Sequence, residues 1–321
     1  MNVLLTFDVE VWCNSWKTLD ADFPNSFERY VYGRSEKGDY ALPKTLEILE
    51  HFGLRGVFFV EPLFATRFGV EPLAVVIRLI RDAGQEIQLH LHPEWTDEAR
   101  SPLLPDSSVK RQFLTDYTLD EQRILIQRGI ELVQAAGAPR PIAFRAGSFA
   151  CNEDTFAAVA ANGLRYDSSI NPEMSVSRPG GVTSDAAGYC EPFRFGRLSL
   201  VPMSSFRDGF GRLRHAQIGA CSASEMIEAL TGAARRNWWN FVLLSHNFEL
   251  LVPDSNRPDD YVVRRFEKVC RFLAANRLSL PTVGFDDLPP VPLPSGADLP
   301  HVRKKATLAR YVEQALRRLP T

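Results

Sequence analysis

The chain has 321 residues, of which 45% are hydrophobic and 24% are charged, and its formal net charge is −2. This composition is ordinary for a globular protein and excludes a disordered or collagen-like chain. The near-neutral charge argues against a dedicated nucleic-acid binder, which usually carries a basic excess. No apolar run reaches the roughly 18 residues that a transmembrane helix needs.

The first residues, MNVLLTFDVEVW, have no basic region and no cleavage site, and Asp8 interrupts their apolar run. We therefore expect a first strand rather than a signal peptide, and a cytoplasmic protein. The five cysteines are scattered, odd in number and without a CxxC motif. A disulfide framework or a structural zinc knuckle is not expected from that pattern.

Strand-like and helix-like runs alternate along the chain. In order, we predict strand 2–8, helix 43–53, strand 55–60, helix 71–84, strand 86–92, helix 119–137, strand 141–145, helix 152–163, strand 164–169, a helix over about 222–236, strand 240–246, helix 259–276 and strand 278–285. Asn152 is a plausible N-cap, and Ser222 with Glu225 forms a capping-box pattern.

Repeated strand-then-helix order predicts a parallel sheet with right-handed crossovers. Seven such units indicate an α/β barrel, and an open doubly wound sheet is the competing architecture. No glycine-rich phosphate loop follows the first strand, so a nucleotide-binding Rossmann unit lacks its fingerprint.

Two regions depart from this alternation. Residues 170–221 are rich in Gly, Pro, Ser and Arg, include a strand-like run at 197–203, and are interpreted as an insertion that lines a substrate groove. Residues 288–300 form a Pro-rich linker between a barrel of residues 1–287 and a tail of residues 301–321. Over 302–318 the tail predicts an amphipathic helix with a basic face. It either packs back on the barrel or contacts anionic lipid or a lipid-linked substrate.

Polar residues stand at the ends of the predicted strands: Asp8, His90, Arg145, Asp167 and His246. In a parallel barrel these ends converge on one face, where active sites form. His90 and His92 are spaced so that both imidazoles point to one side, and Asp8 and Glu10 share that spacing. Two imidazoles and a carboxylate can bind a divalent metal, and Glu94 is a further oxygen ligand to consider. The remaining histidines, His51, His215 and His301, look structural.

Six segments carry a resemblance: TFDVE at 6–10, GVFFV at 56–60, GQEIQLHLH at 84–92, FRAGSF at 144–149, YDSS at 166–169 and LLSH at 243–246. In this order, spanning residues 2 to about 287, they resemble the motifs of the polysaccharide deacetylase family, also called the NodB-homology or carbohydrate esterase family 4 group. The resemblance implies a distorted (β/α)7 barrel followed by the helical tail. It also implies a metal-dependent hydrolase that removes acyl groups from amino sugars.

Position by position, the resemblance makes Asp8 the general base and His90 the first metal histidine. It makes Arg145 the residue that orients the base and His246 the general acid.

Three departures from the family pattern matter. Val9 stands where the family has its metal-binding aspartate, so we expect Glu10 to be the ligand; the alternative makes Asp8 the ligand and Glu10 the base. The second histidine normally follows four residues after the first, where Glu94 stands, so we expect His92 to replace it. The arginine motif reads RAGSF. These changes resemble a divergent branch with DVE and HLHP motifs.

The expected cofactor is a divalent metal, Zn²⁺ first, with Co²⁺, Ni²⁺ or Mn²⁺ as alternatives. Trp12, Trp16 and Trp95 follow the site motifs and suit stacking on a sugar, and Phe149 and Asp167 are expected at the pocket. A backbone N–H near Gly147 to Phe149 is expected to bind the oxyanion. The expected partner is a saccharide, within an intracellular nucleotide- or lipid-linked glycan precursor. Two other functions stay open: a non-catalytic saccharide-binding homologue, or a hydrolase of another non-peptide C–N bond.

Overall fold

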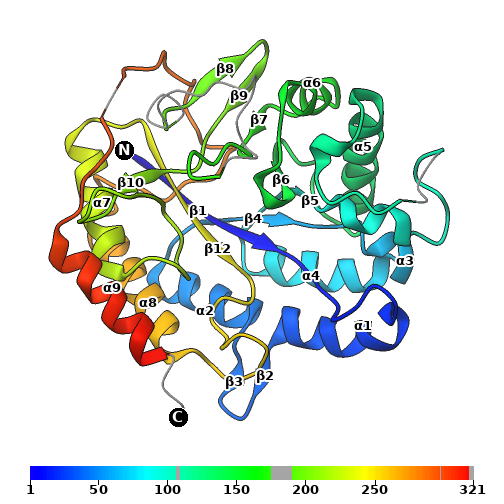
Figure 1. Ribbon diagram of the computed structural model, residues 1–321, viewed down its shortest axis with the longest axis horizontal. Coiled ribbons are helices and arrows are strands. Elements are labelled where there is room, and N and C mark those ends of the chain that lie inside the picture. The colour runs from blue at the N-terminus through cyan, green and yellow to red at the C-terminus, as the bar shows by residue number, and fades with distance from the viewer. Residues whose placement is uncertain (106–108, 175–189, 297, 318–321) are drawn as a thin grey trace.

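One curled sheet forms the centre of the molecule (Figure 1). The computed structural model describes residues 1–105, 109–174, 190–296 and 298–317. The strand order is β12 (Asn240–His246), β1 (Asn2–Val9), β4 (Gly56–Val60), β5 (Glu86–Leu91), β6 (Ala143–Ala146), β7 (Tyr166–Asp167), β9 (Leu198–Leu200) and β8 (Phe193–Phe195). Strands β12 to β9 run parallel, and β8 joins β9 antiparallel. The expected α/β class and barrel-like sheet are confirmed.

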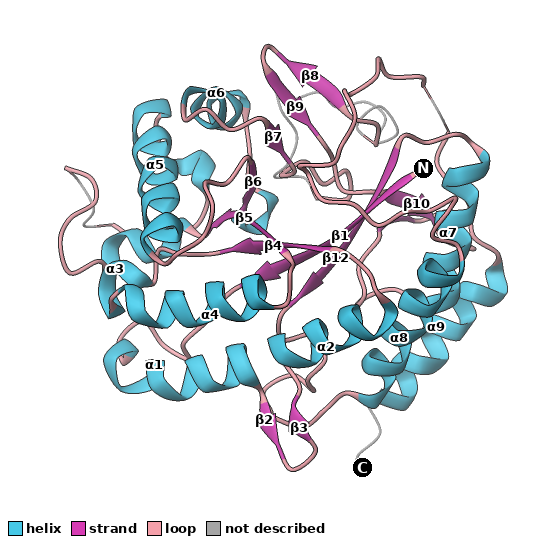
Figure 2. Ribbon diagram, turned by 180° about the vertical axis from the view of Figure 1, so that it is seen from behind, coloured by secondary structure: helices cyan, strands magenta, loops and turns pink. Residues whose placement is uncertain are grey.

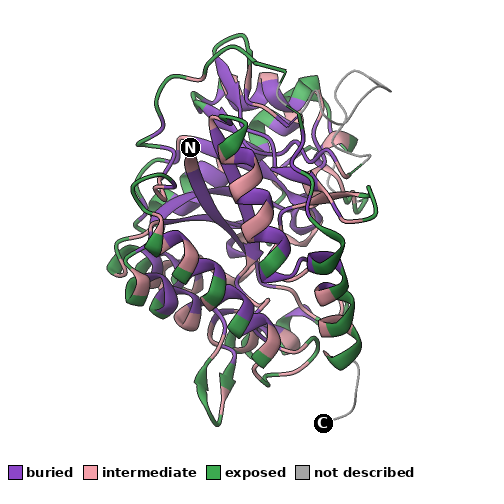
Figure 3. Cartoon of the chain, turned by 90° about the vertical axis from the view of Figure 1, so that its left-hand side faces the viewer, coloured by how far each residue is buried: buried purple, intermediate pink, exposed green. Residues whose placement is uncertain are grey.

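Strands β1 and β4 are buried on both faces and mostly apolar, as is typical of a parallel sheet that is covered on both sides. On β1, Val3, Leu5 and Phe7 belong to the large core between the sheet and the helices, whereas Leu4 packs inside the curl with Phe59. Figure 3 shows the strands buried and the outer helix faces exposed. Because alternate residues of a strand share one face, Asp8 lies on the same inner face as Leu4.

Helices cover the outer side of the sheet (Figure 2). They are α1 (Leu19–Phe27), α2 (Leu42–Phe52), α3 (Ala65–Phe68), α4 (Val70–Asp82), α5 (Leu119–Ala135), α6 (Glu153–Ala161), α7 (Ala223–Arg235), α8 (Asp260–Ala275) and α9 (Lys304–Arg317). Both predicted caps are confirmed: Asn152 accepts from Thr155 N, and Ser222 and Glu225 bond reciprocally. Two hairpins were not predicted, β2–β3 (Arg34–Ser35, Gly38–Asp39) and β10–β11 (Ser205–Arg207, Leu213–His215).

The predicted strand over 278–285 is wrong. This segment makes a single bridge, between Thr282 and Val3, because Pro281 has no N–H to donate and β4 takes the place beside β1 from Leu5 onward. The seventh parallel strand is β9, which comes from the insertion. The number of parallel strands was therefore predicted, but one of them was placed in the wrong segment.

The tail helix α9 packs against α7 and α8 through charged side chains, including Glu313 to Arg265 of α8, rather than through its large apolar residues (Figure 1). Arg310 is buried between Asp208, after β10, and Glu225 of α7, and Arg317 pairs with Asp259. The apolar positions of this helix are exposed instead, at Leu308, Tyr311, Val312 and Leu316. No helix in the described ranges is long and apolar enough to cross a membrane.

Candidate metal centre and active site

The parallel strands bring their carboxyl ends together at one edge of the sheet. Asp8 on β1 is in register with His246 on β12, and His90 on β5 is in register with Arg145 on β6. Glu10 and His92 follow directly after β1 and β5. Residues that are far apart in the chain therefore meet here, as the strand-end pattern predicted.

Glu10, His90 and His92 form a compact cluster. Glu10 Oε1 lies 3.0 Å from His90 Nε2 and 3.0 Å from His92 Nε2. The outer nitrogens have other partners: His90 Nδ1 lies 2.8 Å from the carbonyl oxygen of Arg145, and His92 Nδ1 lies 3.3 Å from Glu94 Oε2. A carbonyl accepts only, so His90 carries a proton on Nδ1, and Nε2 is the nitrogen that faces Glu10.

This donor set fits a divalent metal. One ligand atom from each of Glu10, His90 and His92 lies within 4.8 Å of the others, and two imidazoles with one carboxylate match the ligands that catalytic zinc sites use. Glu94 contacts the far nitrogen of His92, so its place here is beside the ligand rather than among the three convergent atoms.

Glu10 and His92 stabilise each other's charged forms. Burial opposes the charge on Glu10, but the neighbouring His92 and the hydrogen bonds from both imidazoles hold the pKa of Glu10 well below its usual range. Burial likewise opposes the charge on His92, but Glu10 and Glu94 raise its pKa well above the usual range. A bound cation and a proton on His92 would therefore compete for the same carboxylate.

Asp8 is held by Arg145. Arg145 Nη1 donates to Asp8 Oδ1 at 2.6 Å, and the guanidinium also donates to Ser168 O and Oγ at 3.2 and 3.1 Å. Arg145 is fully buried and stacks over the Phe59 ring, 4.2 Å from its centroid. The second oxygen of Asp8, Oδ2, lies 4.0 Å from His90 Nε2 and faces the cluster of Glu10, His90 and His92.

Asp167 lies beneath this arrangement. Its carboxylate accepts from Ser169 N and Ser169 Oγ, both at 2.9 Å, and Ser169 Oγ accepts from Ala146 N. Burial raises the pKa of Asp167 to about 7. Asp167 is inaccessible to solvent, so the expectation that it lies at the substrate pocket gives way to a bracing role for β6.

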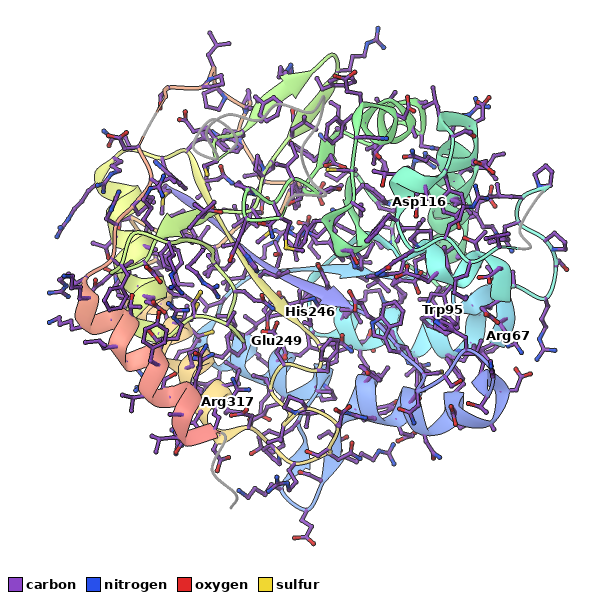
Figure 4. All side chains as sticks on the ribbon, viewed as in Figure 1. Arg67, Trp95, Asp116, His246, Glu249 and Arg317 are labelled. Carbon is purple, nitrogen blue, oxygen red and sulfur yellow. The ribbon has the colours of Figure 1, made fainter. Side chains whose placement is uncertain are left out.

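His246 is oriented by Glu249, which sequence reasoning missed. His246 Nδ1 lies 2.8 Å from Glu249 Oε1, and the two labelled side chains lie together in Figure 4. Glu249 also accepts from Gly219 N, Ser245 Oγ and Gln217 Nε2. Burial alone would lower the pKa of His246, but Glu249 and the nearby carboxylates raise it to about 9. Because Nδ1 is bound to Glu249, Nε2 is the nitrogen left for proton transfer.

Asn247 is a second residue that sequence reasoning missed. It is fully buried, accepts from Glu10 N at 3.0 Å and donates to Glu10 O at 3.1 Å. This pair of bonds fixes the backbone of Glu10 against the end of β12. The only sequence signal was that Asn247 follows His246.

The turn Gly147–Phe149 closes over the cluster. A Cβ on Gly147 would lie 2.6 Å from His92 Nδ1 and 2.7 Å from His92 Cε1, so only glycine allows this approach. Ser148 and Phe149 both have positive φ, 53° and 56°. Consecutive non-glycine residues in this region are strained, and such strain concentrates at functional sites.

The three tryptophans differ in what they can contact. Trp95 is 1% exposed and packs against Phe64 and Phe68, so it presents no face to a sugar and the expected stacking role is corrected. Trp16 has Lys110 Nζ over its ring, 3.8 Å from the centroid. Trp12 is partly exposed, donates from Nε1 to Glu10 Oε2 at 2.6 Å and packs edge-on against His92.

Comparisons with known proteins find relatives by structure. No family model matches the chain, and no curated protein does. A Mycobacterium smegmatis protein provisionally assigned as a polysaccharide deacetylase matches with 21% identity and a TM-score of 0.55, covering 99% of this chain and 92% of its own. A family 4 carbohydrate esterase from Streptomyces lividans, in complex with acetate, matches with 15% identity and a TM-score of 0.45, covering 93% of this chain and 97% of its own.

A third match is the 4-alpha-glucanotransferase from Thermococcus litoralis, with 13% identity and a TM-score of 0.55, covering 98% of this chain and 46% of its own. The chain therefore has the fold of the polysaccharide deacetylases, as its motifs indicate. A glucanotransferase shares this fold at the same TM-score, so function has to be argued from the site.

Proposed function

We propose that this protein is a metal-dependent hydrolase that removes an acyl group, acetyl first, from an N-acylated amino sugar of a glycan or glycan precursor. The observation that carries the proposal is the convergence of Glu10, His90 and His92, flanked on one side by the Asp8–Arg145 pair and on the other by the His246–Glu249 pair. An acid, a base and a metal-binding group are the parts that amide hydrolysis requires.

In this proposal Glu10, His90 and His92 hold Zn²⁺, with Co²⁺, Ni²⁺ or Mn²⁺ as alternatives. A bound divalent ion supplies Lewis-acid chemistry, because it polarises the amide carbonyl and acidifies water. Glu10 is favoured over Asp8 as the ligand because Glu10 Oε1 lies 3.0 Å from both imidazole nitrogens, whereas Asp8 Oδ1 is bound by Arg145. Trp12 and Asn247 fix Glu10 in this orientation.

Asp8 is the proposed general base, with Oδ2 directed at the cluster while Arg145 keeps the carboxylate ionised and oriented. His246 is the proposed general acid. Its raised pKa, about 9, keeps it protonated at neutral pH, which is the state that can protonate a leaving amine. Protonation is required because an amine anion is a very poor leaving group.

The remaining proposed contacts concern the substrate. The turn Gly147–Phe149 would present a backbone N–H to the developing oxyanion. In support of this role, the turn has two strained residues and lies against the His92 ring. Trp12 and Phe149 are the proposed sugar contacts at the rim, since both are partly exposed.

We also propose contact with a lipid-linked substrate through the tail, restricted to the exposed side of α9. Arg303, Arg310 and Arg317 are engaged in ion pairs with the body of the protein. Any lipid contact would therefore use the exposed stripe of α9 that contains Leu308, Tyr311, Val312 and Leu316, together with the exposed Lys304 and Lys305.

Metal content and product identity test the proposal together. The purified chain should bind one Zn²⁺ and release acetate from N-acetylated glucosamine oligomers or their nucleotide-linked precursors. Asp8→Asn should keep the metal and lose activity, whereas His90→Ala should lose both. Full activity in either variant would refute the assigned roles. Substoichiometric metal with no product would favour a non-catalytic binder, and release of formate in place of acetate would favour another C–N hydrolase.

A further inference from the structure

A chain of hydrogen bonds extends from His246 toward the surface through the insertion. His246 Nδ1 lies 2.8 Å from Glu249 Oε1, and Gln217 Nε2 donates to the same oxygen. On its other side, Gln217 Oε1 lies 2.8 Å from His215 Nε2. His215 Nδ1 lies 2.6 Å from Glu173 Oε2, and Glu173 is partly exposed. Three side chains, Glu249, Gln217 and His215, thus link the proposed general acid His246 to the half-buried carboxylate of Glu173.

The backbone places these groups together. Residues 216–218 run beside β12, because Leu244 N donates to Ala216 O and Ile218 N donates to Leu244 O. Gln217 is therefore fixed next to the strand that carries His246, and His215 is the last residue of β11. The insertion that sequence analysis assigned to a substrate groove contributes directly to the environment of His246.

Chemistry fixes the direction of each bond. The Glu249 carboxylate can only accept, so the amide of Gln217 must turn its NH₂ toward it and its Oε1 toward His215. His215 Nε2 must then donate. Glu173 accepts from Arg214 Nη1 and from His215 N, which is the behaviour of an ionised carboxylate, so His215 Nδ1 must donate as well. In this arrangement both ring nitrogens of His215 act as hydrogen-bond donors.

We propose that His215 and Gln217 are positioning residues for His246: the His215 ring fixes the Gln217 amide by donating to its oxygen, and that amide holds Glu249 where it receives the Nδ1–H of His246. This inference rests on the proposed function, in which His246 protonates the leaving amine. If His215 lost the proton on Nε2, the Gln217 amide would turn to donate to it. Gln217 would then present an oxygen to Glu249, and the repulsion would displace Glu249 from His246.

The groups that face His215 are Glu173, Arg214 and Gln217, with Cys221 Sγ donating to its carbonyl oxygen and the Phe149 ring 6.4 Å away. Glu173 is thus the carboxylate that directly contacts the ring among the described residues. Phe149 also lies on the turn over the metal cluster, so the outer end of the chain borders the proposed sugar rim.

Nuclear magnetic resonance of the zinc-loaded full chain, labelled with ¹⁵N-histidine, tests the hydrogen bonds of His215 without any need for activity. Both ring nitrogens of His215 should show the shifts of N–H donors, and His215→Asn assigns them by removing those signals. Gln217→Met, which keeps the volume and removes the amide, should shift the Nδ1–H proton of His246 and speed its exchange with water. A His215 Nε2 without the shift of an N–H donor, or an unchanged His246 signal in Gln217→Met, would overturn the proposal.

Kinetics provide the second readout. Gln217→Met should lower kcat about tenfold and leave KM within about twofold, as expected when one hydrogen bond to a charged group is lost away from the substrate. His215→Phe, which keeps a ring but removes both donors, should act the same way. The matched control is Gln127→Met, because Gln127 bonds only to Glu131 on the surface of α5 in the described contacts. If both site variants keep the kcat of the wild type, the positioning proposal is overturned. If the wild type itself is inactive, the proposed function is refuted, and the resonance result alone decides the positioning proposal.

Discussion

Glu249→Gln provides the sharpest test of the assignment of His246. The substitution keeps the shape of the side chain and an oxygen that can accept from His246 Nδ1, but it removes the negative charge. In the native protein, the pKa of His246 is raised from 6.5 to about 9, and Glu249 is the largest contributor that raises it. That net shift corresponds to about 3 kcal/mol at roughly 1.36 kcal/mol per pKa unit. Burial is the largest cause and opposes the shift, so Glu249, Glu10 and Asp8 together raise the pKa by more than the net change.

The shift can be converted into a rate. At pH 8, a group with a pKa of about 9 is roughly 90% protonated, whereas a group with the ordinary pKa of about 6.5 is roughly 3% protonated. A return of the His246 pKa to about 6.5 would therefore lower kcat/KM about 30-fold at pH 8 and little at pH 6. A bound cation would lower the pKa of His246 in both proteins. The quantity to compare is therefore the difference in pH at which kcat/KM falls on the alkaline side of the two pH–rate profiles. The assay is acetate release between pH 5.5 and 10, with Glu131→Gln on the surface of α5 as the control. Alkaline limbs that coincide would refute the reasoning.

Stability should follow the same group. Because the folded pKa of His246 is raised, its contribution is fully present below about pH 6.5 and is lost as pH rises through about 9. Urea denaturation should therefore show a deficit in Glu249→Gln that is largest near pH 6 and that disappears above about pH 9; a deficit independent of pH would contradict this. Arg145→Met leaves Asp8 buried without its partner and should cost about 3–5 kcal/mol of unfolding free energy, and an equally stable variant would disprove the pairing. Gly147→Ala drives a methyl group into the His92 ring and should weaken zinc binding at least tenfold with an unchanged fold by circular dichroism, as measured by competition with a chelating dye; native affinity would contradict the close approach. Leu308→Gln with Val312→Gln should abolish cosedimentation with phosphatidylglycerol vesicles if the α9 stripe contacts lipid, and absence of binding by wild type would reject that contact.

The local sequence pattern correctly predicted the strands and helices that depend mainly on neighbouring residues in the chain. The strand 240–246 was predicted with its observed bounds, because NFVLLSH is a buried apolar run between polar residues. The strand-end rule then brought Asp8, His90 and His246 to one edge without knowledge of their distances. The run at 278–285 misled because an apolar segment does not reveal whether a neighbouring position beside β1 is already occupied by β4.

The predictions that were wrong or missing concern residues whose partners lie far away in the sequence. Leu308 and Val312 mark one side of α9 as apolar, and a helix is normally expected to bury that side. The observed side is set by Arg310, whose acidic partners Asp208 and Glu225 stand far earlier in the chain. Glu249 was missed for a similar reason. Its position depends on a hydrogen bond from Gln217, which the sequence pattern does not indicate.

The contact between Gly147 and His92 has a consequence for substitution. The His92 ring occupies the space in which any other residue at position 147 would place its Cβ. A side chain at position 147 and the present orientation of His92 therefore exclude each other. Two residues 55 positions apart in the chain thus act as one packing unit, in which a change in the turn is felt at the imidazole.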